Sequence, residues 1–421
     1  MKLLLVGSGG REHALALKLL ENPKITELYA APGNGGLSAI ATPVNIKATD
    51  VEGMVKFAEE TGIDFAVVAP DDPLVLGMVD AFEAVHIPTF GPNKAAAILE
   101  GSKVFSKNLM KKYGNPTAAY ETFADEQAAV AYLKAQNTYP AVIKADGLAL
   151  GKGVIIAQNE AEALDAVHSM MSDHIFGASG SHVVIEEFLE GPEVSVLSFT
   201  DGKTVVPMIS SKDHKRALDN DQGLNTGGMG TIAPNPYYTP EIADECMKTI
   251  FLPTIEAMKK EGRPFKGCLY FGLMITKNGP RVIEYNCRFG DPETQVVLPL
   301  LKTDLFEIMQ AVYEERLSDM KVEFSDQHAA CVIMASGGYP KKYQTGYEIS
   351  GLDEKGQAEG VTVYHAGTKL ENGRFLTSGG RVLGVTALGS SREEALARSY
   401  EAVKKISFQD VHYRTDIGKI E

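Results

Sequence analysis

Three polar side chains alternate along the predicted strand 281–287 and its continuation. In the run RVIEYNCR (281–288), a period of two puts Glu284, Asn286 and Arg288 on one face. A carboxylate and an amide oxygen two residues apart suit a Mg²⁺ ion that also holds phosphate oxygens. Arg288 can stabilise charge on a transferred phosphoryl group. The spacing indicates a metal–nucleotide site, and the alternative is a cross-strand salt bridge on an exposed sheet.

A lysine on a second apolar strand precedes a glycine-rich loop. Lys144 lies on the predicted strand 141–145, and a loop with Gly147, Gly151, Lys152 and Gly153 follows it. An ammonium among apolar residues is costly unless it meets an anion, and loop amides can fold around phosphates. The loop does not fit the G-x-x-x-x-G-K-[ST] pattern. We expect phosphate binding here, and the alternative is an exposed hairpin with a solvated lysine.

The first glycine cluster follows the apolar strand 2–6. Gly9, Gly10 and Arg11 open a predicted helix, whose N-terminal amides can hold an anion. The dinucleotide fingerprint G-x-G-x-x-G has Glu12 in place of its third glycine, which disfavours NAD binding. The cluster therefore predicts an anion site, and a tight strand–helix turn without a ligand is the alternative.

Two further polar segments are candidates for ligand contacts. The predicted strand 183–187 ends in carboxylates, and its backbone could meet a purine edge while Glu193 accepts hydrogen bonds from ribose hydroxyls. A solvated strand end is the alternative. The loop 211–230 is long, polar and glycine-rich, which is typical of functional or disordered loops. His214 within it is interpreted as a loop residue and not as a catalytic base.

The elements that must position these residues alternate in type. Strands at 2–6, 27–31 and 65–69, each followed by a glycine or proline turn, predict a parallel α/β sheet with ligands at the strand C-terminal ends. Residues 120–195 predict a compact α+β insert. Later helices are expected near 240–260 and 293–317, and Ser102 and Ser391 are predicted helix N-caps, Ser391 with a capping box to Glu394.

The composition bounds the class of protein. The chain has 421 residues, a formal net charge of −14, 44% hydrophobic and 23% charged residues, which are values of a soluble globular protein. The negative charge argues against nucleic acid and anionic membranes as partners, and no apolar run reaches a membrane span. Four cysteines without zinc spacing indicate reduced, mostly buried thiols in a cytoplasmic protein. The apolar start is a first strand and not a signal peptide.

Seven segments in a fixed order resemble the ATP-grasp superfamily and, within it, the phosphoribosylamine–glycine ligase family. The resemblance covers essentially the whole chain and rests on GSGGREHA (7–14), APGNGG (31–36), KADGLALGKGV (144–154), EEFLEGPEVS (186–195), KDHKR (212–216), NTGGMGT (225–231) and EYNCRFGDPET (284–294). It implies an ATP-grasp fold of α/β and α+β domains. The implied division is an N-terminal parallel α/β substrate domain (1–100), an ATP-grasp domain (101–325) with a lid subdomain (about 120–193), and a small C-terminal α+β domain (326–421).

The resemblance also implies a reaction and its residues. ATP, glycine and 5-phosphoribosylamine would give glycinamide ribonucleotide, ADP and phosphate through a glycyl phosphate, in purine biosynthesis, on a monomer with Mg²⁺ or Mn²⁺. Glu284 and Asn286 would bind the metal, and Asp213, Lys215 and Arg288 would act at the reacting groups. The implied ATP contacts are Lys103, Lys144, Gly147, Gly151, Lys152, Gly153, Glu186, Glu187, Phe188, Leu189 and Glu193. The implied substrate contacts, undivided between glycine and phosphoribosylamine, are Gly9, Gly10, Arg11, Gly33, Asn34, Asp71, Asp72, Asn225, Gly227 and Gly228.

Two positions depart from the family pattern. The strand 268–276 has no carboxylate, which leaves the number of metal ions open, and Asp71-Asp72 stands where a glutamate is expected. The alternatives are another ATP-grasp carboxylate–amine ligase or carboxylase, or a dinucleotide-binding protein.

Overall fold

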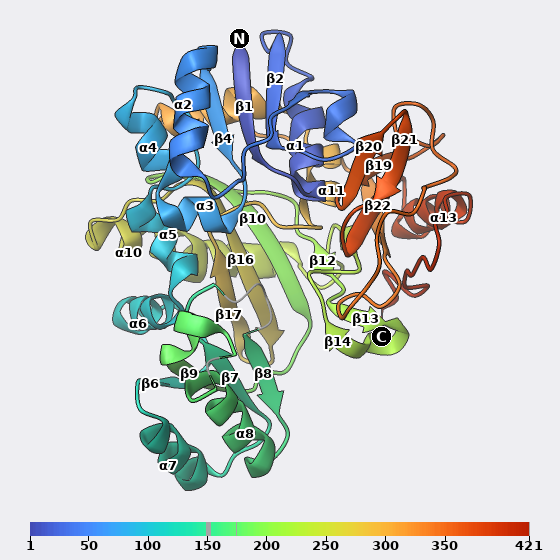
Figure 1. Ribbon diagram of the computed structural model, residues 1–421. Coiled ribbons are helices and arrows are strands. Elements are labelled where there is room, and N and C mark those ends of the chain that lie inside the picture. The colour runs from blue at the N-terminus through green and yellow to red at the C-terminus, as the bar shows by residue number, and fades with distance from the viewer. Residues whose placement is uncertain (149–152, 174, 421) are drawn as a thin grey trace.

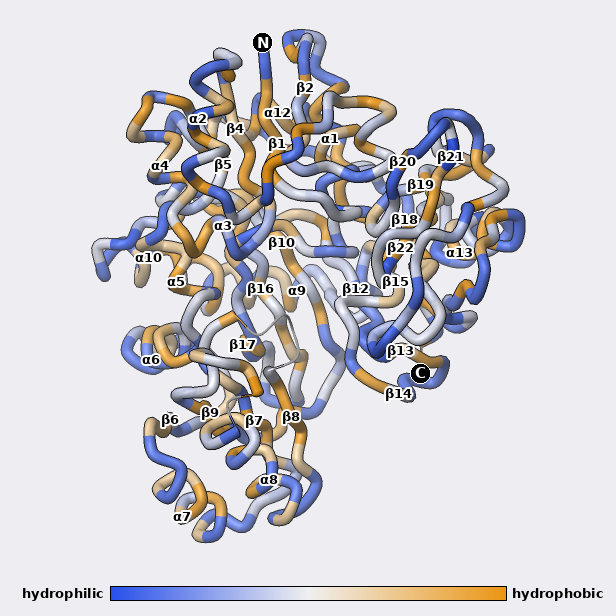
Figure 2. The backbone as a smooth tube through the Cα atoms, in the orientation of Figure 1, coloured by the Kyte–Doolittle hydropathy of each residue, from blue (hydrophilic) through white to orange (hydrophobic). Residues whose placement is uncertain are grey.

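The computed structural model describes residues 1–148, 153–173 and 175–420. The N-terminal sheet lies at one end of the molecule, a small four-stranded sheet at the other, and the C-terminal residues flank the centre (Figure 1). Figure 2 shows hydrophobic residues gathered along the strands and inner helix faces, with hydrophilic residues on many outer loops. The mixed α/β multidomain class predicted from the sequence is confirmed.

The N-terminal sheet is wholly parallel, in the order β3-β2-β1-β4-β5. Its strands read as continuous apolar runs because helices and other elements bury both faces. Leu3 to Leu5, for example, are all fully buried. The prediction of a parallel α/β sheet is confirmed. Its elements are β1 (Lys2–Gly7), α1 (Gly10–Leu19), β2 (Glu27–Pro32), β3 (Thr42–Pro43), α2 (Val51–Thr61), β4 (Phe65–Val68), α3 (Asp71–Leu76), α4 (Met78–Ala84) and β5 (Thr89–Phe90).

Two helices connect this sheet to the rest of the chain. The helices α5 (Lys94–Gly101) and α6 (Lys103–Tyr113) are separated by Ser102, which has extended backbone angles. The Ser102 hydroxyl accepts a hydrogen bond from the Phe105 amide, so the predicted N-cap is confirmed.

The predicted α+β insert is a four-stranded sheet in the order β6-β9-β7-β8. It packs its core on α7 (Glu126–Gln136) and α8 (Glu160–Met171), and the insert is confirmed as a compact unit. The strands are β6 (Tyr120–Phe123), β7 (Ala141–Ala145), β8 (Val154–Ala157) and β9 (Val183–Glu187).

The central sheet is antiparallel, in the order β11-β10-β16-β17. The helix predicted near 293–317 is wrong as a single element, because the chain becomes extended at Leu301 and a new helix begins after the Asp304 N-cap. The elements are β10 (Glu193–Asp201), β11 (Val205–Pro207), α9 (Pro240–Cys246), a π-helical turn (Met247–Phe251), α10 (Leu252–Lys260), β16 (Lys266–Thr276), β17 (Gly279–Asn286), α11 (Thr294–Val297) and α12 (Leu305–Tyr313).

The C-terminal sheet takes strands from two distant parts of the chain. Its order is β12-β15-β18-β22-β19, so two strands from the 212–233 region pair with strands that follow residue 327. The Ser391 cap is confirmed, although Glu394 closes onto Ser390 and not onto Ser391. The elements are β12 (Lys212–Asp213), β13 (Arg216–Leu218), β14 (Gln222–Asn225), β15 (Gly230–Ala233), β18 (His328–Ala335), β19 (Thr362–His365), β20 (Thr368–Glu371), β21 (Arg374–Thr377), β22 (Arg381–Gly389) and α13 (Arg392–Val403).

The composition predicted buried, reduced cysteines and no membrane-spanning segment. All four cysteines are free thiols in buried positions, as predicted. Among the described residues, no helix combines the length and the apolar character needed to cross a membrane.

Candidate active site

The predicted metal residues lie on β17, the edge strand of the central sheet. Glu284 pairs in register with Gly272, and Asn286 pairs with Tyr270 on β16. The strand ends at Asn286, so Arg288 is not a strand residue, but its Nη2 still lies 3.4 Å from the Asn286 Oδ1 that accepts its hydrogen bond. The structure therefore brings the three predicted side chains together at the end of one strand.

Cationic side chains from several elements converge on Glu284. Burial opposes ionisation of this carboxyl, but Lys215, Lys144, Lys103 and Arg288 together hold the pKa of Glu284 below its ordinary value. Glu284 is therefore a carboxylate at neutral pH. The same cations would face the anionic oxygens of any polyphosphate bound beside it.

The two predicted phosphate lysines reach this place from different elements. Lys103, in the first turn of α6, donates to the Gly147 carbonyl at 2.7 Å, and burial lowers its pKa. Lys144 on β7 donates to the Ile283 carbonyl of β17 at 3.1 Å. The Lys144 contact joins the four-stranded sheet of the insert to the central sheet, and the Lys103 contact joins α6 to the loop after β7.

The glycine loop is described only at its two ends. Gly147 has a φ of +85°, which favours glycine, and the Gly153 carbonyl accepts the Ala145 amide at 2.8 Å. The predicted contacts of Gly151 and Lys152 lie outside the described residues.

Asp146, at the start of the same loop, caps α6. Its carboxylate accepts hydrogen bonds from the Ser102 hydroxyl, the Val104 amide and the Gly147 amide. An anion at a helix N-terminus is stabilised by the unpaired amides and the helix dipole.

A buried ion-pair cluster underlies the predicted adenine segment. The Glu186 carboxylate lies 3.0 Å from Lys144 and 3.3 Å from Lys107. Burial lowers the pKa of Lys107 to about 8, and this lysine was missed because it follows no loop or strand end. Its position in the α6 pattern, among buried residues, is the signal that could have found it.

The rest of the adenine segment lies at the surface. Glu187 pairs with the Ala119 backbone through both its own amide and its carboxylate. Phe188 is an exposed aromatic side chain, and Leu189 is half-buried. An exposed apolar ring beside free backbone is consistent with a planar ligand, so the adenine contacts stay a prediction.

Lys215 connects two of the predicted ligand residues. Its Nζ lies 3.2 Å from the Glu193 carboxylate and 4.0 Å from that of Glu284. The Glu193 charge raises the pKa of Lys215 well above its usual range. Asp213 is nearby, and burial followed by the charge of Glu293 raises the pKa of Asp213. Lys215 therefore lies within ion-pair distance of the predicted metal residue Glu284, and Asp213 lies two residues before it in the chain.

Two carboxylates that the sequence analysis did not predict, Glu293 and Glu100, also lie near the predicted site residues. Glu293, on the turn after β17, accepts a hydrogen bond from Tyr270 at 3.0 Å, and burial raises its pKa. Glu100 lies 3.1 Å from Arg288 and accepts the Cys287 amide at 2.7 Å. Burial raises the pKa of Glu100 to about 7. A carboxylate in the otherwise apolar helix KAAAILEG was the available signal for Glu100.

The predicted acidic turn lies on the other side of Arg288. Asp71 contributes to the electrostatic environment of both Arg288 and Glu100. Burial, with the Asp71 charge, raises the pKa of Asp72. The structure therefore brings the N-terminal parallel sheet to the same place as β17.

The amides of the first glycine cluster already have carboxylate partners. The Gly9 amide donates to Glu12 at 2.7 Å, and the Arg11 amide donates to Asp291 at 3.3 Å. The Arg11 guanidinium is held by Glu12 and by the Phe289 carbonyl. Gly10 is buried at the start of α1. The Glu12 and Asp291 carboxylates therefore occupy the Gly9 and Arg11 amides, where an external anion was expected. Contacts of Gly9 and Arg11 with a substrate stay a prediction.

Asn34 connects the second glycine segment (31–36) to neighbouring backbone through side-chain hydrogen bonds. Its Nδ2 donates to the Ser8 and His365 carbonyls at 2.9 and 2.8 Å, and its Oδ1 accepts the Leu37 amide. The Asn34 side chain therefore has protein partners on both ends. Gly33, with a φ of +77°, donates to the Gly7 carbonyl.

The third glycine segment is held by residues from the C-terminal sheet. Arg381 donates to the Gly227 carbonyl at 2.8 Å, and the Gly227 amide donates to the Tyr339 hydroxyl at 3.1 Å. Gly228 is buried against Asp213 and Pro292, whereas Asn225 is exposed on β14, where it pairs with Arg216. Sequence patterns did not single out Arg381 or Tyr339, which lie about 110–155 residues away in the chain.

His214 has a structural position, as predicted. It is buried, its Nδ1 lies 3.0 Å from the Gly230 carbonyl, and its Nε2 accepts the Gly418 amide at 3.1 Å. Burial lowers its pKa to about 4. The ring is therefore neutral at pH 7 and carries its proton on Nδ1.

Comparisons with known proteins agree with this arrangement. Residues 1–100, 101–294 and 329–420 match the N domain, the ATP-grasp (A) domain and the C domain of phosphoribosylglycinamide synthetase. The chain is 48% identical to the phosphoribosylamine–glycine ligase of Caldanaerobacter subterraneus subsp. tengcongensis, over 99% of both chains. It is also 48% identical to that of Clostridium acetobutylicum, over 100% of both chains.

Solved structures give the same result. The crystal structure of phosphoribosylamine–glycine ligase from Thermotoga maritima is similar with a TM-score of 0.87 and 33% identity, covering 99% of this chain and 100% of that one. A biotin carboxylase domain from Hydrogenobacter thermophilus, in complex with MgADP and bicarbonate, has a TM-score of 0.74 at 17% identity, covering 98% and 91%, and shares the fold. The chain therefore belongs to the phosphoribosylglycinamide synthetase family and has the ATP-grasp fold.

Proposed function

We propose that this chain is an ATP-dependent ligase of purine biosynthesis that joins glycine to 5-phosphoribosylamine. The products are glycinamide ribonucleotide, ADP and phosphate. The observation that carries the proposal is the convergence of Lys103, Lys144, Lys215 and Arg288 on the ionised Glu284. The family and the names of its relatives support the choice of substrates.

The donor set at the end of β17 fits a divalent cation. Glu284 is ionised, Asn286 offers an amide oxygen two residues further along the same strand, and both are half-buried. Such oxygen ligands suit Mg²⁺, which keeps further positions for phosphate oxygens, and Mn²⁺ can bind similar groups. A bound cation would neutralise phosphate charge during transfer.

The side chains divide the work of the first step. Lys103 and Lys144 neutralise the ATP phosphates, together with the loop 147–153, and the segment 186–189 with Glu193 holds the nucleoside. A glycine carboxylate oxygen attacks the terminal phosphorus of ATP, the bond from phosphorus to the bridging oxygen breaks, and ADP leaves. Arg288 faces the transferred group, whose charge it stabilises.

In the second step the amine of phosphoribosylamine attacks the acyl carbon of glycyl phosphate. The carbon–nitrogen bond forms, the carbon–oxygen bond to phosphate breaks, and the proton lost by the nitrogen ends on the phosphate that leaves. Asp213 and Lys215 lie beside the reacting groups in this proposal, and the N-terminal turns and the 225–228 segment supply substrate contacts. Holding amine and acyl phosphate together contributes on the order of 7–11 kcal/mol to lowering the barrier.

The proposal extends to the organisation of the chain. We assign residues 1–100 as substrate domain, 101–325 as ATP-grasp domain with a lid at about 120–193, and 326–421 as a small C-terminal domain. The expected protein is a cytoplasmic monomer that binds small molecules and neither nucleic acid nor membranes. Sedimentation equilibrium tests the oligomeric state.

The decisive experiment measures ADP release with MgATP, glycine and freshly generated phosphoribosylamine, each omitted in turn. Release that needs all three supports the proposal. Release driven by bicarbonate in place of glycine would assign the chain a carboxylase reaction, and tight NAD binding without ATP turnover would favour a dinucleotide-binding protein.

A further inference from the structure

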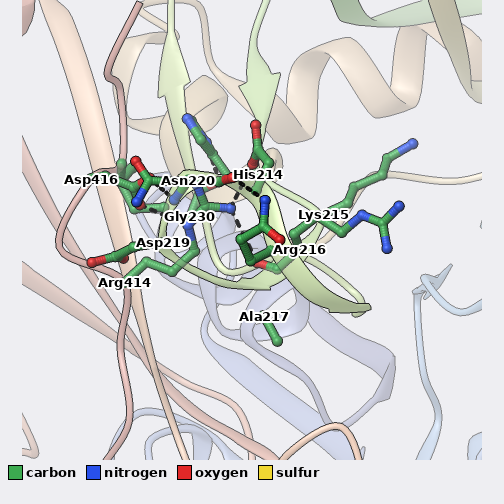
Figure 3. Close-up of polar contacts among 12 residues, drawn as sticks. His214, Lys215, Arg216, Ala217, Asp219, Asn220, Gly230, Arg414 and Asp416 are labelled. Carbon is green, nitrogen blue, oxygen red and sulfur yellow. Dashed lines mark hydrogen bonds and ion pairs between the residues drawn. The ribbon is translucent and has the colours of Figure 1, made fainter.

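The C-terminal end of the chain lies against the segment that carries Asp213 and Lys215. In Figure 1 the C-terminus lies beside the hairpin of β13 and β14. Figure 3 shows Arg414 and Asp416 grouped with His214, Asp219 and Asn220, whereas the Lys215 side chain extends away from this group. We call residues 412–418 the C-terminal strap.

Arg414 is the centre of the strap. Its side chain is only 2% exposed. Its Nη1 donates to the Arg216 carbonyl at the start of β13, at 3.1 Å, and to the Asp221 carboxylate in the turn before β14, at 2.8 Å. Its Nε and Nη2 donate to the two Asp416 carboxylate oxygens at 2.8 and 3.0 Å. A buried guanidinium with paired, geometrically fixed donors holds its partners rigidly.

Other strap residues hold the rest of the hairpin. The Asp416 carboxylate accepts the Asn220 amide at 2.7 Å, and the Thr415 amide donates to Asp219 at 2.8 Å. His412 Nε2 lies 2.7 Å from the Ala217 carbonyl. Among the described residues, every hydrogen bond that joins 216–225 to a distant part of the chain goes to 412–416.

The strap also fixes the residue next to Lys215. The Gly418 amide donates to His214 Nε2, whose ring lies on the buried side. On the other side of the chain, Lys215 reaches Glu193 and Glu284. The strap thus holds the backbone of 214–216 on one side, and the Lys215 side chain extends on the other side towards Glu193 and Glu284.

We propose that the C-terminal strap positions Lys215 for the ligase reaction, with Arg414 and Asp219 as positioning residues. The inference rests on the proposed function for its kinetic consequences. A displacement of about 1 Å in a reacting group can cost on the order of 10²-fold in rate, and a loop without the strap would lose its tertiary hydrogen bonds.

The test uses the full chain with two strap variants and a matched control. Asp219→Ala removes the acceptor of Thr415 at a half-buried position, and Arg414→Met removes the guanidinium. Lys419→Ala, at an exposed position beside the strap, is the control. Because Arg414→Met leaves Asp416 unpaired and can fail to fold, Asp219→Ala decides the outcome in that case.

The expected result has three parts. In Asp219→Ala the kcat/KM for phosphoribosylamine falls at least tenfold, while the Kd of MgATP and the melting temperature stay close to those of Lys419→Ala. In a Lys215→Ala background, Asp219→Ala changes kcat/KM less than twofold, because both changes act through one group. Amide hydrogen exchange at 213–218 speeds up at least tenfold, and this readout does not depend on the reaction.

Opposite results separate the two proposals. Unchanged exchange at 213–218 in a folded strap variant overturns the positioning role, whatever the activity. An equal loss from Asp219→Ala with and without Lys215 overturns the route through Lys215. A parent protein that needs no glycine or phosphoribosylamine for ADP release overturns the proposed function instead, while faster exchange would still support the strap.

Discussion

The Nη1 of Arg381 donates both to the Gly227 carbonyl, at 2.8 Å, and to the Asp291 carbonyl, at 2.9 Å. The Asp291 side chain in turn accepts the Arg11 amide. One guanidinium at the start of β22 thus connects the glycine turn, the turn after β17 and the start of α1. Three segments that resemble the family in sequence meet at a residue that belongs to none of them.

Arg381→Met should lower kcat/KM for phosphoribosylamine and glycine by one to two orders of magnitude. The change removes the anchor of the 227–228 turn, whose displacement misplaces neighbouring groups. Steady-state kinetics on the folded variant checks this. Arg374→Met is the control, because Arg374 is exposed and its side chain pairs with Glu348 at the surface, at 3.5 Å. Equal kinetics for the two variants would refute the role of Arg381.

Glu284→Gln should leave the fold intact and lower MgATP-dependent turnover by at least 10²-fold. The amide keeps the shape of the side chain but removes the charge that a cation and its phosphates need. ADP release and circular dichroism measure the two effects. Normal turnover in the variant would disprove the metal assignment.

Gly228→Ala should abolish most activity. Gly228 has a φ of +122°, and a Cβ there would lie 2.5 Å from Pro292 Cδ and 2.6 Å from the Asp213 carboxylate. The turn must therefore move, and Asp213 with it. Gly262→Ala is matched in its positive φ, of +72°, but has open space around its Cβ. It should cost only about 1 kcal/mol of stability, measured by urea unfolding, and retain activity.

Lys144→Met should raise the KM for MgATP at least tenfold with a smaller loss of stability than the double variant Lys107→Met/Lys144→Met. The reason is that Glu186 keeps Lys107, 3.3 Å away, as a partner in the single variant, whereas the double variant leaves a buried carboxylate unpaired. Titration with MgATP and thermal unfolding test both points. Lys134→Met, on the exposed face of α7, should change neither quantity, and an unchanged KM in Lys144→Met would count against its phosphate role.

The free energy of unfolding should fall as the pH drops from 6.5 towards 4. Burial lowers the pKa of His365 from 6.5 to about 4, although the hydrogen bond to the Gly356 carbonyl opposes part of this shift. A lowered pKa in the folded state gives stability that is fully present above 6.5 and is lost as the pH falls through 4. At about 1.36 kcal/mol per pKa unit, the loss is on the order of 3 kcal/mol.

Urea unfolding at pH 7 and pH 4 measures this loss. His365→Gln retains a donor near the Gly356 carbonyl and should reduce the pH dependence, while the part that comes from His214 remains. His328→Gln, at a half-buried strand end, serves as the control. A slope that His365→Gln leaves unchanged would show that other groups cause it.

Local patterns predicted much of the fold. The parallel N-terminal sheet, the insert, the Ser102 cap and the strands around Lys144 and Glu284 were all recovered, because burial on one or both faces imposes a short-range period on the chain. The single helix predicted near 293–317 was wrong because the chain is extended at Leu301, and the polar residues Lys302, Thr303 and Asp304 follow before Asp304 caps the next helix.

Site residues could be predicted from the sequence where a polar or charged side chain lies on a predicted strand or near its end. Lys144, Glu284, Asn286 and Arg288 were singled out from their places on strands, whereas the family resemblance supplied Lys103 and Lys215. All six side chains converge in the structure. Glu100, Lys107, Glu293 and Arg381 were missed. Each lies inside a helix, in a turn or at the start of a strand, where no local pattern marks it. Each contributes to the site through a contact with a residue from another segment of the chain.

By itself, the sequence determined the reaction class, because the residue types and their spacing match one superfamily in order. Only the tertiary structure decided which charges neutralise one another. Asp291 occupies the Arg11 amide that a sequence pattern offers to a phosphate, and the C-terminal strap holds the backbone beside Lys215. The physical reason is that Coulomb and hydrogen-bond energies depend on distance in space, and separations of about 200 residues in the chain leave no local trace of a 3 Å contact.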